Sequence, residues 1–247
     1  MRLIFPAPAS ADDLDDDALV ARYAPDRSRQ TVRVNFAASL DGAVEVGGFS
    51  EPLSGPADKR VFKILRQHCD ALLVGAGTVR NEGYHAVTLD PARRAWREAH
   101  GLAPYPVPAI VSASLALDPR ADILARAPVR PIVFTHDGAP ADRRAALADV
   151  ADVVSCGVAT VDLGVALAQL RSRGLPHVLS EGGPHLFGGL VAADLVDELC
   201  LTYSPQLAGA GAERIVAGPV PAAPLGMRLV HALFAEDSLI TMYARAR

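Results

Sequence analysis

The sequence predicts an α/β fold of three layers, α/β/α, in which helices cover both faces of a central mixed, mostly parallel sheet. Short β-rich runs alternate along the chain with stretches of helical spacing, which is typical of parallel strands joined by crossover helices. The last two β-rich runs, 226–235 and 238–245, are joined by Glu236 and Asp237 alone, which leaves no room for a crossover helix. We therefore expect an antiparallel pair at the C-terminal end.

Residues 1–30 are predicted to be an N-terminal extension. The segment 7–30 is rich in Ala, Pro and acids, and five aspartates between 12 and 17 precede a short apolar stretch. Carboxylates favour the N-terminus of a helix, so we expect a solvated arm that contains a short helix. The β-rich pattern begins at Thr31, and we place the domain at 31–247.

The first element of the domain is a strand predicted at 31–36, where side chains of opposite polarity alternate. A helix follows, with Ser54 or Gly55 as its cap and Pro56 in its first turn. Further strands are predicted at 70–75, 107–112, 130–135, 151–156, 176–183 and 197–205, and further helices at about 140–149, 162–173 and 184–192.

Composition excludes several classes of protein. The formal net charge is −4 and the basic residues are scattered, so we expect neither a nucleic acid nor a membrane as partner. The 3 cysteines form no CxxC pair and the 7 histidines form no ligand cluster, so no disulfide framework and no metal site is expected. No secretion signal or membrane span is apparent, and we expect a cytoplasmic protein.

The first candidate binding loop is LLVGAGTVRNEGY, at 72–84. Gly75 and Gly77 follow a predicted buried strand, and Thr78, Arg80 and Glu82 come next. In α/β proteins, ligands bind at the carboxyl ends of parallel strands. The loop has neither the third glycine of a dinucleotide fingerprint nor the Gly-Lys-Ser/Thr of a P-loop, so by itself it is also explained as a plain turn.

A second glycine loop repeats this design at 178–191, VLSEGGPHLFGGLV. Gly182 and Gly183 end a predicted strand, and Pro184 begins a helix. Glycines allow a ligand to approach the backbone, and the free N–H groups of a first helical turn suit a phosphate. Glu181 lies at the mouth of this loop, where it either caps the turn or faces a polar group of a ligand.

The third segment is NFAASLDGAVEVGG, at 35–48. Ala37 and Ala38 would allow a flat ring to lie against the backbone at the end of a strand. Asp41 has two explanations, either a side chain that binds its own turn or a carboxylate of the active site.

These three segments, in this order, resemble the pyrimidine reductase family of riboflavin biosynthesis. The resemblance covers about residues 31 to 245 and implies a fold like that of dihydrofolate reductase, NADPH as cofactor and a homodimer. The C-terminal β-rich runs also have edges that need covering, either by pairing of two copies or by strands of the same chain, and the sequence leaves both open. The family resemblance implies a stand-alone NADPH-dependent reductase of a pyrimidine-type small molecule, similar to 5-amino-6-(5-phosphoribosylamino)uracil reductase.

Site residues are implied by the same resemblance, together with the two glycine loops. The catalytic candidates are Glu181 and Asp41, with Glu82 as another possible proton source. The candidates for substrate contact are Ser50, Arg66 and Glu181. The candidates for cofactor contact are Ala37, Gly75, Gly77, Thr78, Arg80, Glu82, Ser112, Gly182, Gly183, Pro184, His185, Leu186 and Phe187.

The chain also departs from the family pattern. It lacks the H-x-E and P-C-x-x-C motifs of the zinc deaminase that many relatives carry, so we expect only the reductase step. Gly83 replaces a proline, and Asp90 stands where an arginine that helps to hold the phosphorylated sugar would fall. Two alternatives therefore stay open, a dihydrofolate or dihydropterin type of reductase and a non-catalytic NADP-binding protein.

Overall fold

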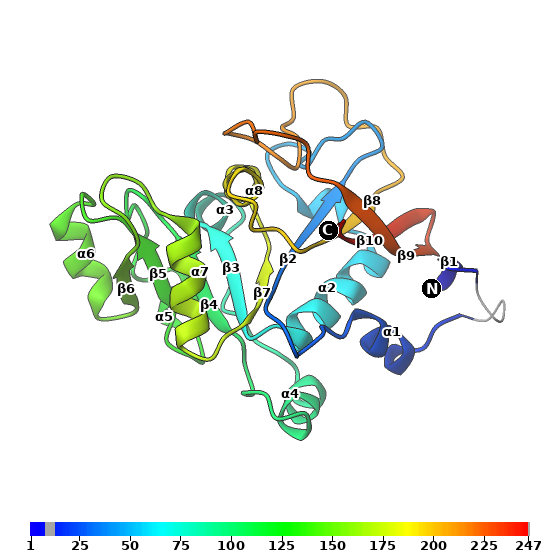
Figure 1. Ribbon diagram of the computed structural model, residues 1–247, viewed down its shortest axis with the longest axis horizontal. Helices are drawn as coiled ribbons and strands as arrows, with labels where there is room; N and C mark the ends of the chain where they lie inside the picture. The colour runs from blue at the N-terminus through cyan, green and yellow to red at the C-terminus, as the bar shows by residue number, and fades with distance from the viewer. Residues whose placement is uncertain (8–12, 247) are drawn as a thin grey trace.

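The protein is built on a mixed sheet, seen here in a computed structural model that describes residues 1–7 and 13–246 (Figure 1). Within these residues the sheet has ten strands in the order β1-β9-β10-β8-β2-β7-β3-β4-β5-β6. Its parallel part consists of β8 (Glu198–Tyr203), β2 (Thr31–Ala38), β7 (His177–Ser180), β3 (Ala71–Gly75), β4 (Val107–Val111), β5 (Ile132–Thr135) and β6 (Asp152–Ser155). Three antiparallel strands complete one edge, so the predicted mixed, mostly parallel sheet is confirmed.

The antiparallel edge consists of β10 (Ser238–Arg245), β9 (Met227–Ala235) and β1 (Arg2–Phe5). Strands β9 and β10 form the expected hairpin, and its turn residues Glu236 and Asp237 have φ values of 52° and 58°. Two residues with positive φ are typical of a type I′ turn. The Glu236 side chain accepts a hydrogen bond from the Ala57 backbone N–H at 3.0 Å. The hairpin thereby satisfies a free donor at the start of the neighbouring helix.

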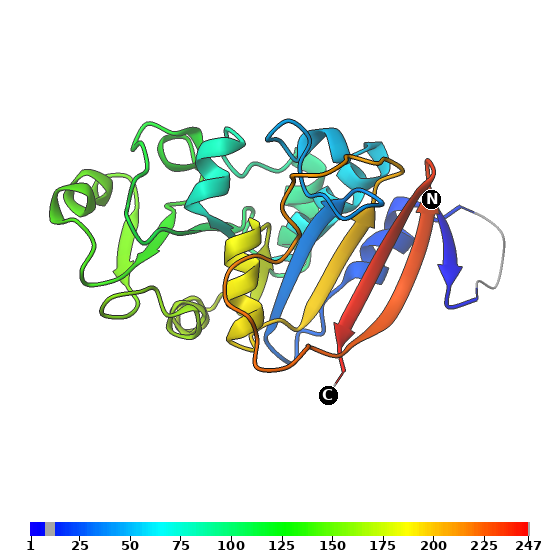
Figure 2. The ribbon, with the colours of Figure 1, turned by 90° about the horizontal axis from the view of Figure 1, so that it is seen from above.

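Helices cover both faces of the sheet, which confirms the three predicted layers (Figure 2). One face carries α7 (Leu163–Ser172) and α8 (Pro184–Ala192), which pack on β2, β3 and β5. The opposite face carries α1 (Asp16–Tyr23), α2 (Pro56–His68), α3 (Ala76–Asn81), α5 (Asp122–Ala125) and α6 (Ala141–Ala148). Strand β3 shows why both faces are apolar: Leu73 faces α7 and α8, whereas Leu72 and Val74 face α3.

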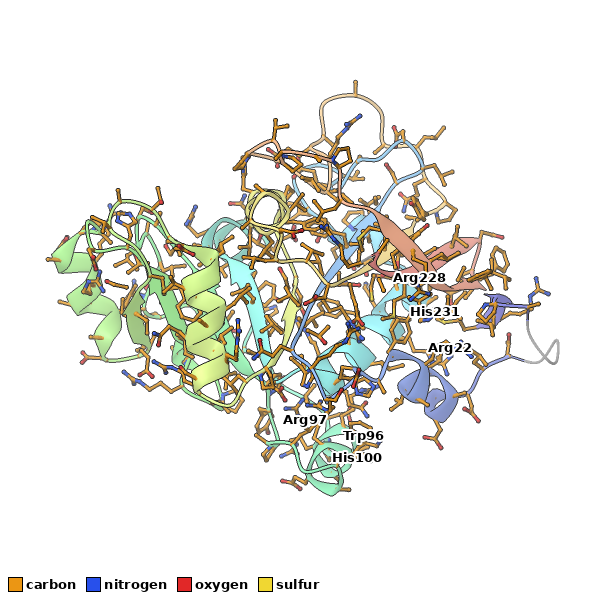
Figure 3. All side chains as sticks on the ribbon, in the orientation of Figure 1. Arg22, Trp96, Arg97, His100, Arg228 and His231 are labelled. Atoms are coloured by element: carbon orange, nitrogen blue, oxygen red, sulfur yellow. The ribbon has the colours of Figure 1, made fainter. Side chains whose placement is uncertain are left out.

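Helix α2 is held at both ends. Its N-cap is Gly55 with Pro56 in the first turn, as predicted. At its C-terminal end, buried Arg97 donates hydrogen bonds to the backbone oxygens of Gln67 at 2.9 Å and Cys69 at 2.7 Å. Arg97 belongs to α4 (Pro91–Ala99), a helix that the sequence analysis does not predict, and Figure 3 shows it beside Trp96 and His100. A cation at a helix C-terminus stabilises the free carbonyl groups there.

The N-terminal segment differs from the prediction. The predicted short helix exists as α1, capped by Asp15, but Leu19 and Tyr23 on it are fully buried. Strand β1 pairs with β9, so it extends the same sheet as the rest of the chain. The expected solvated arm is therefore wrong for 16–23, because this segment buries apolar surface against the domain. Part of the predicted arm, 8–12, lies outside the described residues.

Smaller differences concern the ends of elements. Strand β2 continues to Ala38, and β7 ends at Ser180, before the glycine loop. Helix α3 begins directly after Gly75, where we expected only a loop. A short 3-10 helix, Glu51–Leu53, precedes α2. Within the described part of the chain, no helix has the length and apolar character needed to cross a membrane.

Candidate active site

A cavity of about 430 Å³ opens at the carboxyl ends of β2, β3 and β7. These strands are neighbours in the sheet although β7 is remote from the other two in sequence. The cavity is also bordered by the start of α2, by α3, by the start of α8 and by the loop after β2. It therefore lies where parallel sheets place their ligands, and all three segments that the sequence analysis singles out reach it.

The two glycine loops lie against each other. Gly75 donates its backbone N–H to the Gly182 oxygen at 2.7 Å, and Glu181 donates its own to the Leu73 oxygen at 2.9 Å. A methyl group added to Gly183 would come within 2.7 Å of the Thr78 hydroxyl oxygen. The structure thus brings the two loops together as the sequence analysis expects, because β3 and β7 pair directly.

Glycine is required at Gly182. Its φ of +77° is rarely adopted by other residues, and a Cβ there would approach the Phe36 ring to 2.5 Å. The peptide bond between Gly182 and Gly183 is cis. Phe36 in turn stacks on Phe187 of α8, with ring centres 5.4 Å apart. The turn therefore packs against the Phe36 ring, and Gly183, not Gly182, borders the cavity.

Glu181 and Arg66 form a two-pronged ion pair beside the cavity. Arg66 donates from Nε to Oε1 and from Nη2 to Oε2 of Glu181, both at 2.7 Å. The exposed fractions of the two side chains are 18% for Arg66 and 4% for Glu181. Burial alone would lower the pKa of Arg66, but the charge and hydrogen bonds of Glu181 outweigh it and raise that pKa. The pair is held in one geometry, and Glu181, not Arg66, borders the cavity.

Two aromatic side chains fix the guanidinium group of Arg66. It lies over the Phe62 ring at 4.2 Å from the ring centre, and its Nη2 also donates to the Tyr84 hydroxyl at 2.8 Å. Phe62 borders the cavity one helical turn before Arg66. Arg66 therefore orients Glu181. Arg66 itself does not border the cavity, so the substrate contact predicted for it has no support in the cavity lining.

Ser50 and Glu82, two further predicted site residues, also meet. The Ser50 backbone N–H donates to Oε1 of Glu82 at 3.0 Å, and both residues border the cavity. Glu82 ends α3, so this bond ties the loop before α2 to the first glycine loop. The cofactor and substrate candidates are thereby joined across the opening of the cavity.

Asp41 is placed differently from the catalytic role considered for it. It accepts hydrogen bonds from the Ser39 hydroxyl and from the backbone N–H groups of Ala208 at 3.1 Å and Gly209 at 2.8 Å. These bonds lower the pKa of Asp41 to about 2. It does not border the cavity. The structure thus favours a structural role for Asp41, because its carboxylate ties the turn after β2 to the backbone of residues 208–209 and lies outside the cavity lining.

Other candidates, Gly182 included, do not border the cavity. Arg80 donates to the Ala116 oxygen at 3.2 Å, and buried Ser112 has a hydroxyl without a hydrogen-bond partner among the described residues. Phe187 belongs to the core. Asp90, noted above for its departure from the family, caps α4 by accepting from the Arg93 backbone N–H at 2.9 Å. The candidates that do border the cavity are Ala37, Ser50, Gly75, Gly77, Thr78, Glu82, Glu181, Gly183, Pro184, His185 and Leu186.

Several residues that border the cavity were not among those predicted. The most important are Asp58, Lys59 and Phe62, all on α2. Asp58, Phe62 and Arg66 recur at every fourth position, and this spacing was a signal that one face of the helix is functional. The cavity is strongly acidic. Among the described residues that border it, the only Lys or Arg is Lys59, whereas the acids are Glu45, Glu51, Asp58, Glu82, Glu181 and Glu213. No group of metal-ligating side chains comes together in the described residues.

Comparisons with known proteins agree with this architecture. Residues 30–237 match the model of the RibD C-terminal domain. A 2,5-diamino-6-ribosylamino-4(3H)-pyrimidinone 5′-phosphate reductase of Methanothermobacter thermautotrophicus is 31% identical over 182 residues, 73% of this chain and 80% of that protein. The reductase of the same name from Archaeoglobus fulgidus is also 31% identical over 182 residues, 73% of this chain and 83% of that protein.

Among solved structures, a pyrimidine reductase-like protein of Corynebacterium diphtheriae has a TM-score of 0.80 at 24% identity, covering 88% of this chain and 92% of that chain. The riboflavin biosynthesis reductase of Saccharomyces cerevisiae has a TM-score of 0.69 at 18% identity, covering 92% and 98%. These likenesses support the fold. The extent of the domain match and the identity with the archaeal enzymes show that this chain belongs to the RibD C-terminal domain family and is a reductase.

Proposed function

We propose that the chain reduces a 2,5-diamino-6-ribosylamino-pyrimidinone 5′-phosphate with NADPH. The observation that supports this function best is the meeting of both glycine loops and the Glu181–Arg66 pair at one cavity. The archaeal relatives carry the name of this activity. The uracil form of the substrate, which the sequence analysis considered, becomes the second candidate.

The residues present fit the cofactor. A Cβ at Gly182 would meet the Phe36 ring and one at Gly183 the Thr78 hydroxyl, so glycines keep this turn compact where α8 begins with free backbone N–H groups. Such a backbone accepts a pyrophosphate close to the helix N-terminus. When bound, NADPH supplies the hydride that reduces the carbon–nitrogen double bond of the ring-opened ribosylamino group.

The chain's own residues orient the reacting group and stabilise the charge that develops on it. Glu181, fixed by Arg66, provides a carboxylate beside the nitrogen that must become or stay protonated as hydride arrives. Ser50 and Glu82 hold the opening, and Phe36 and Phe62 provide apolar walls that limit the access of water.

The direct test is oxidation of NADPH by the purified chain, followed by absorbance, with the diaminopyrimidinone ribosyl phosphate as acceptor. We expect one reduced ribityl product per NADPH consumed. Tight NADPH binding without oxidation by this acceptor, by the uracil form or by a dihydropterin would instead support a non-catalytic NADP-binding protein.

A preference for NADPH over NADH is expected, and Arg80 is our candidate for the 2′-phosphate because a guanidinium pairs well with phosphate. Arg80 is exposed at the end of α3, where it has only a carbonyl as hydrogen-bond partner in the described structure. Calorimetry should show weaker binding of NADH. Replacement of Arg80 by alanine should reduce that difference; if the difference stays, the phosphate contact lies elsewhere.

A homodimer is also proposed, through the open face of β8, β10 and β9. In the register of these strands, Tyr203, Leu239 and Phe234 form one apolar row, and Leu229 lies opposite Tyr243. Helices α1 and α2 cover the other face, whereas Figure 2 shows this face without a helix in front of it, within the described residues. Phe234 keeps 37% of its surface exposed. An apolar sheet face of this kind suits a symmetric partner.

The dimer is checked by sedimentation of the wild type and of Phe234→Glu. We expect a species of about twice the chain mass of 25.9 kDa for the wild type and a folded monomer for the variant. Val158→Glu, at an exposed apolar residue between β6 and α7, is the matched control and should remain dimeric. A wild-type monomer at all concentrations would contradict the proposal.

A further inference from the structure

Asp58 is a buried aspartate that borders the cavity and forms no ion pair with the described residues. It lies in the first turn of α2, keeps 5% of its surface exposed and borders the cavity. Its carboxylate accepts hydrogen bonds from the hydroxyl groups of Ser54 and Thr202. In the part of the chain that the structure describes, no basic side chain lies within ion-pair distance of it.

Three other acids of the cavity have partners of their own. Glu181 is paired with Arg66, Glu51 with Lys59 at 2.5 Å, and Glu82 accepts from the Ser50 backbone. Burial raises the pKa of Asp58, whereas the Ser54 and Thr202 hydroxyls oppose that rise by binding the ionised form. A buried carboxylate is costly unless N–H or O–H groups satisfy its oxygens. Asp58 is therefore a buried acid of this site that, among the described residues, has hydroxyl partners but no ion pair, and its carboxylate can accept further N–H donors from a ligand.

The proposed substrate offers such donors on one edge. A pyrimidinone with an amino group at C2 carries an amino N–H beside the N3–H, so two donors point the same way. The deaminated uracil ring has a C2 carbonyl in place of the amino group. A carboxylate accepts both donors of the first ring but meets a carbonyl oxygen on the second, which leaves two acceptors facing each other.

We propose that Asp58 binds the 2-amino and N3–H edge of the pyrimidinone and thereby selects the 2-amino ring over the deaminated ring. This assignment rests on the proposed function. Phe62, one turn along α2, lies beside Asp58 on the cavity wall and offers an aromatic surface next to the ring edge. The acidic lining of the rest of the cavity also suits a ring that is rich in N–H donors.

The test is Asp58→Asn, which replaces two acceptors by one acceptor and one donor of the same shape. We expect the ratio of kcat/KM for the 2-amino substrate over the uracil substrate to fall by about 10²-fold or more, because unpaired polar groups in a hydrogen-bonding site are strongly disfavoured. NADPH affinity should stay unchanged. Asp142→Asn changes an aspartate in the first turn of α6, outside the cavity lining, and is the matched control, with an unchanged ratio.

A second measurement needs neither folding of the variant nor turnover. Calorimetry of the wild type with NADPH should show that 2,5,6-triaminopyrimidin-4-one binds at least ten times more tightly than 5,6-diaminouracil. Equal binding of the two rings, or an unchanged kcat/KM ratio in a folded Asp58→Asn protein, would overturn the assignment. Failure of the proposed function is distinct, because then the wild type would oxidise NADPH with neither ribosyl phosphate whatever its preference between the free rings.

Discussion

Glu181→Gln is expected to lower turnover by about 10²-fold or more while NADPH affinity changes little, in line with the usual contribution of a general acid or base. Glutamine keeps the shape of the side chain and one acceptor oxygen but removes the charge beside the reacting nitrogen. It also leaves Arg66 without its carboxylate, and Arg66 has Tyr84 as its other side-chain hydrogen-bond partner. Turnover should be measured at saturating NADPH, with melting temperature recorded alongside.

Two further variants separate charge from position. Glu181→Asp keeps the charge but withdraws it from Arg66, so it should recover less than wild-type turnover and more than glutamine. Glu98→Gln removes an exposed acid of α4 that does not border the cavity and should leave turnover nearly unchanged. Lost NADPH binding with normal turnover at saturating cofactor would make Glu181 a structural cap of the glycine turn.

Gly183→Val is expected to weaken NADPH binding by at least ~1–3 kcal/mol, the cost of a strained or unsatisfied site. The added side chain would press on the Thr78 hydroxyl, since the first carbon alone comes within 2.7 Å of it. Either the loop moves away from its neighbour or the side chain enters the space proposed for the pyrophosphate. Calorimetric titration with NADPH measures the loss directly.

Gly226→Ala is the control for that measurement. Its added carbon would make only an ordinary contact of 3.6 Å with Ala246, far along the chain from the glycine loops. It should bind NADPH like the wild type. Unchanged affinity in Gly183→Val would show that the cofactor does not approach this turn.

The sheet was predictable because its signals are local. Apolar runs and their flanking glycines and prolines mark β3, α2 and α8, and the short link at Glu236 identifies the hairpin. The N-terminal strand was not predictable, because residues 2–5 become a strand only by pairing with β9, at the other end of the chain. The burial of Tyr23 likewise depends on partners far away in the sequence. One of them is His231, whose ring centre lies 4.8 Å from that of Tyr23.

The candidate site likewise has a part that could be predicted from the sequence and a part that could not. The glycine loops are visible as motifs, and their contact follows from the adjacency of β3 and β7. Asp41 and Asp58 show the limit of such reasoning, because both are aspartates near the start of a turn or helix. Backbone donors from residues 208–209 occupy Asp41, whereas the fold turns Asp58 toward the cavity, and neither fact can be read from the neighbouring sequence.

The bond between Glu236 and the start of α2 gives the C-terminal hairpin a role at a distance. One face of that hairpin forms the proposed dimer interface. The turn of the hairpin also holds the start of α2, the helix that carries Asp58 and Arg66. Subunit association and substrate affinity would then be thermodynamically linked: substrate should favour the paired state, and dilution to monomers should raise KM for the pyrimidine before it affects NADPH.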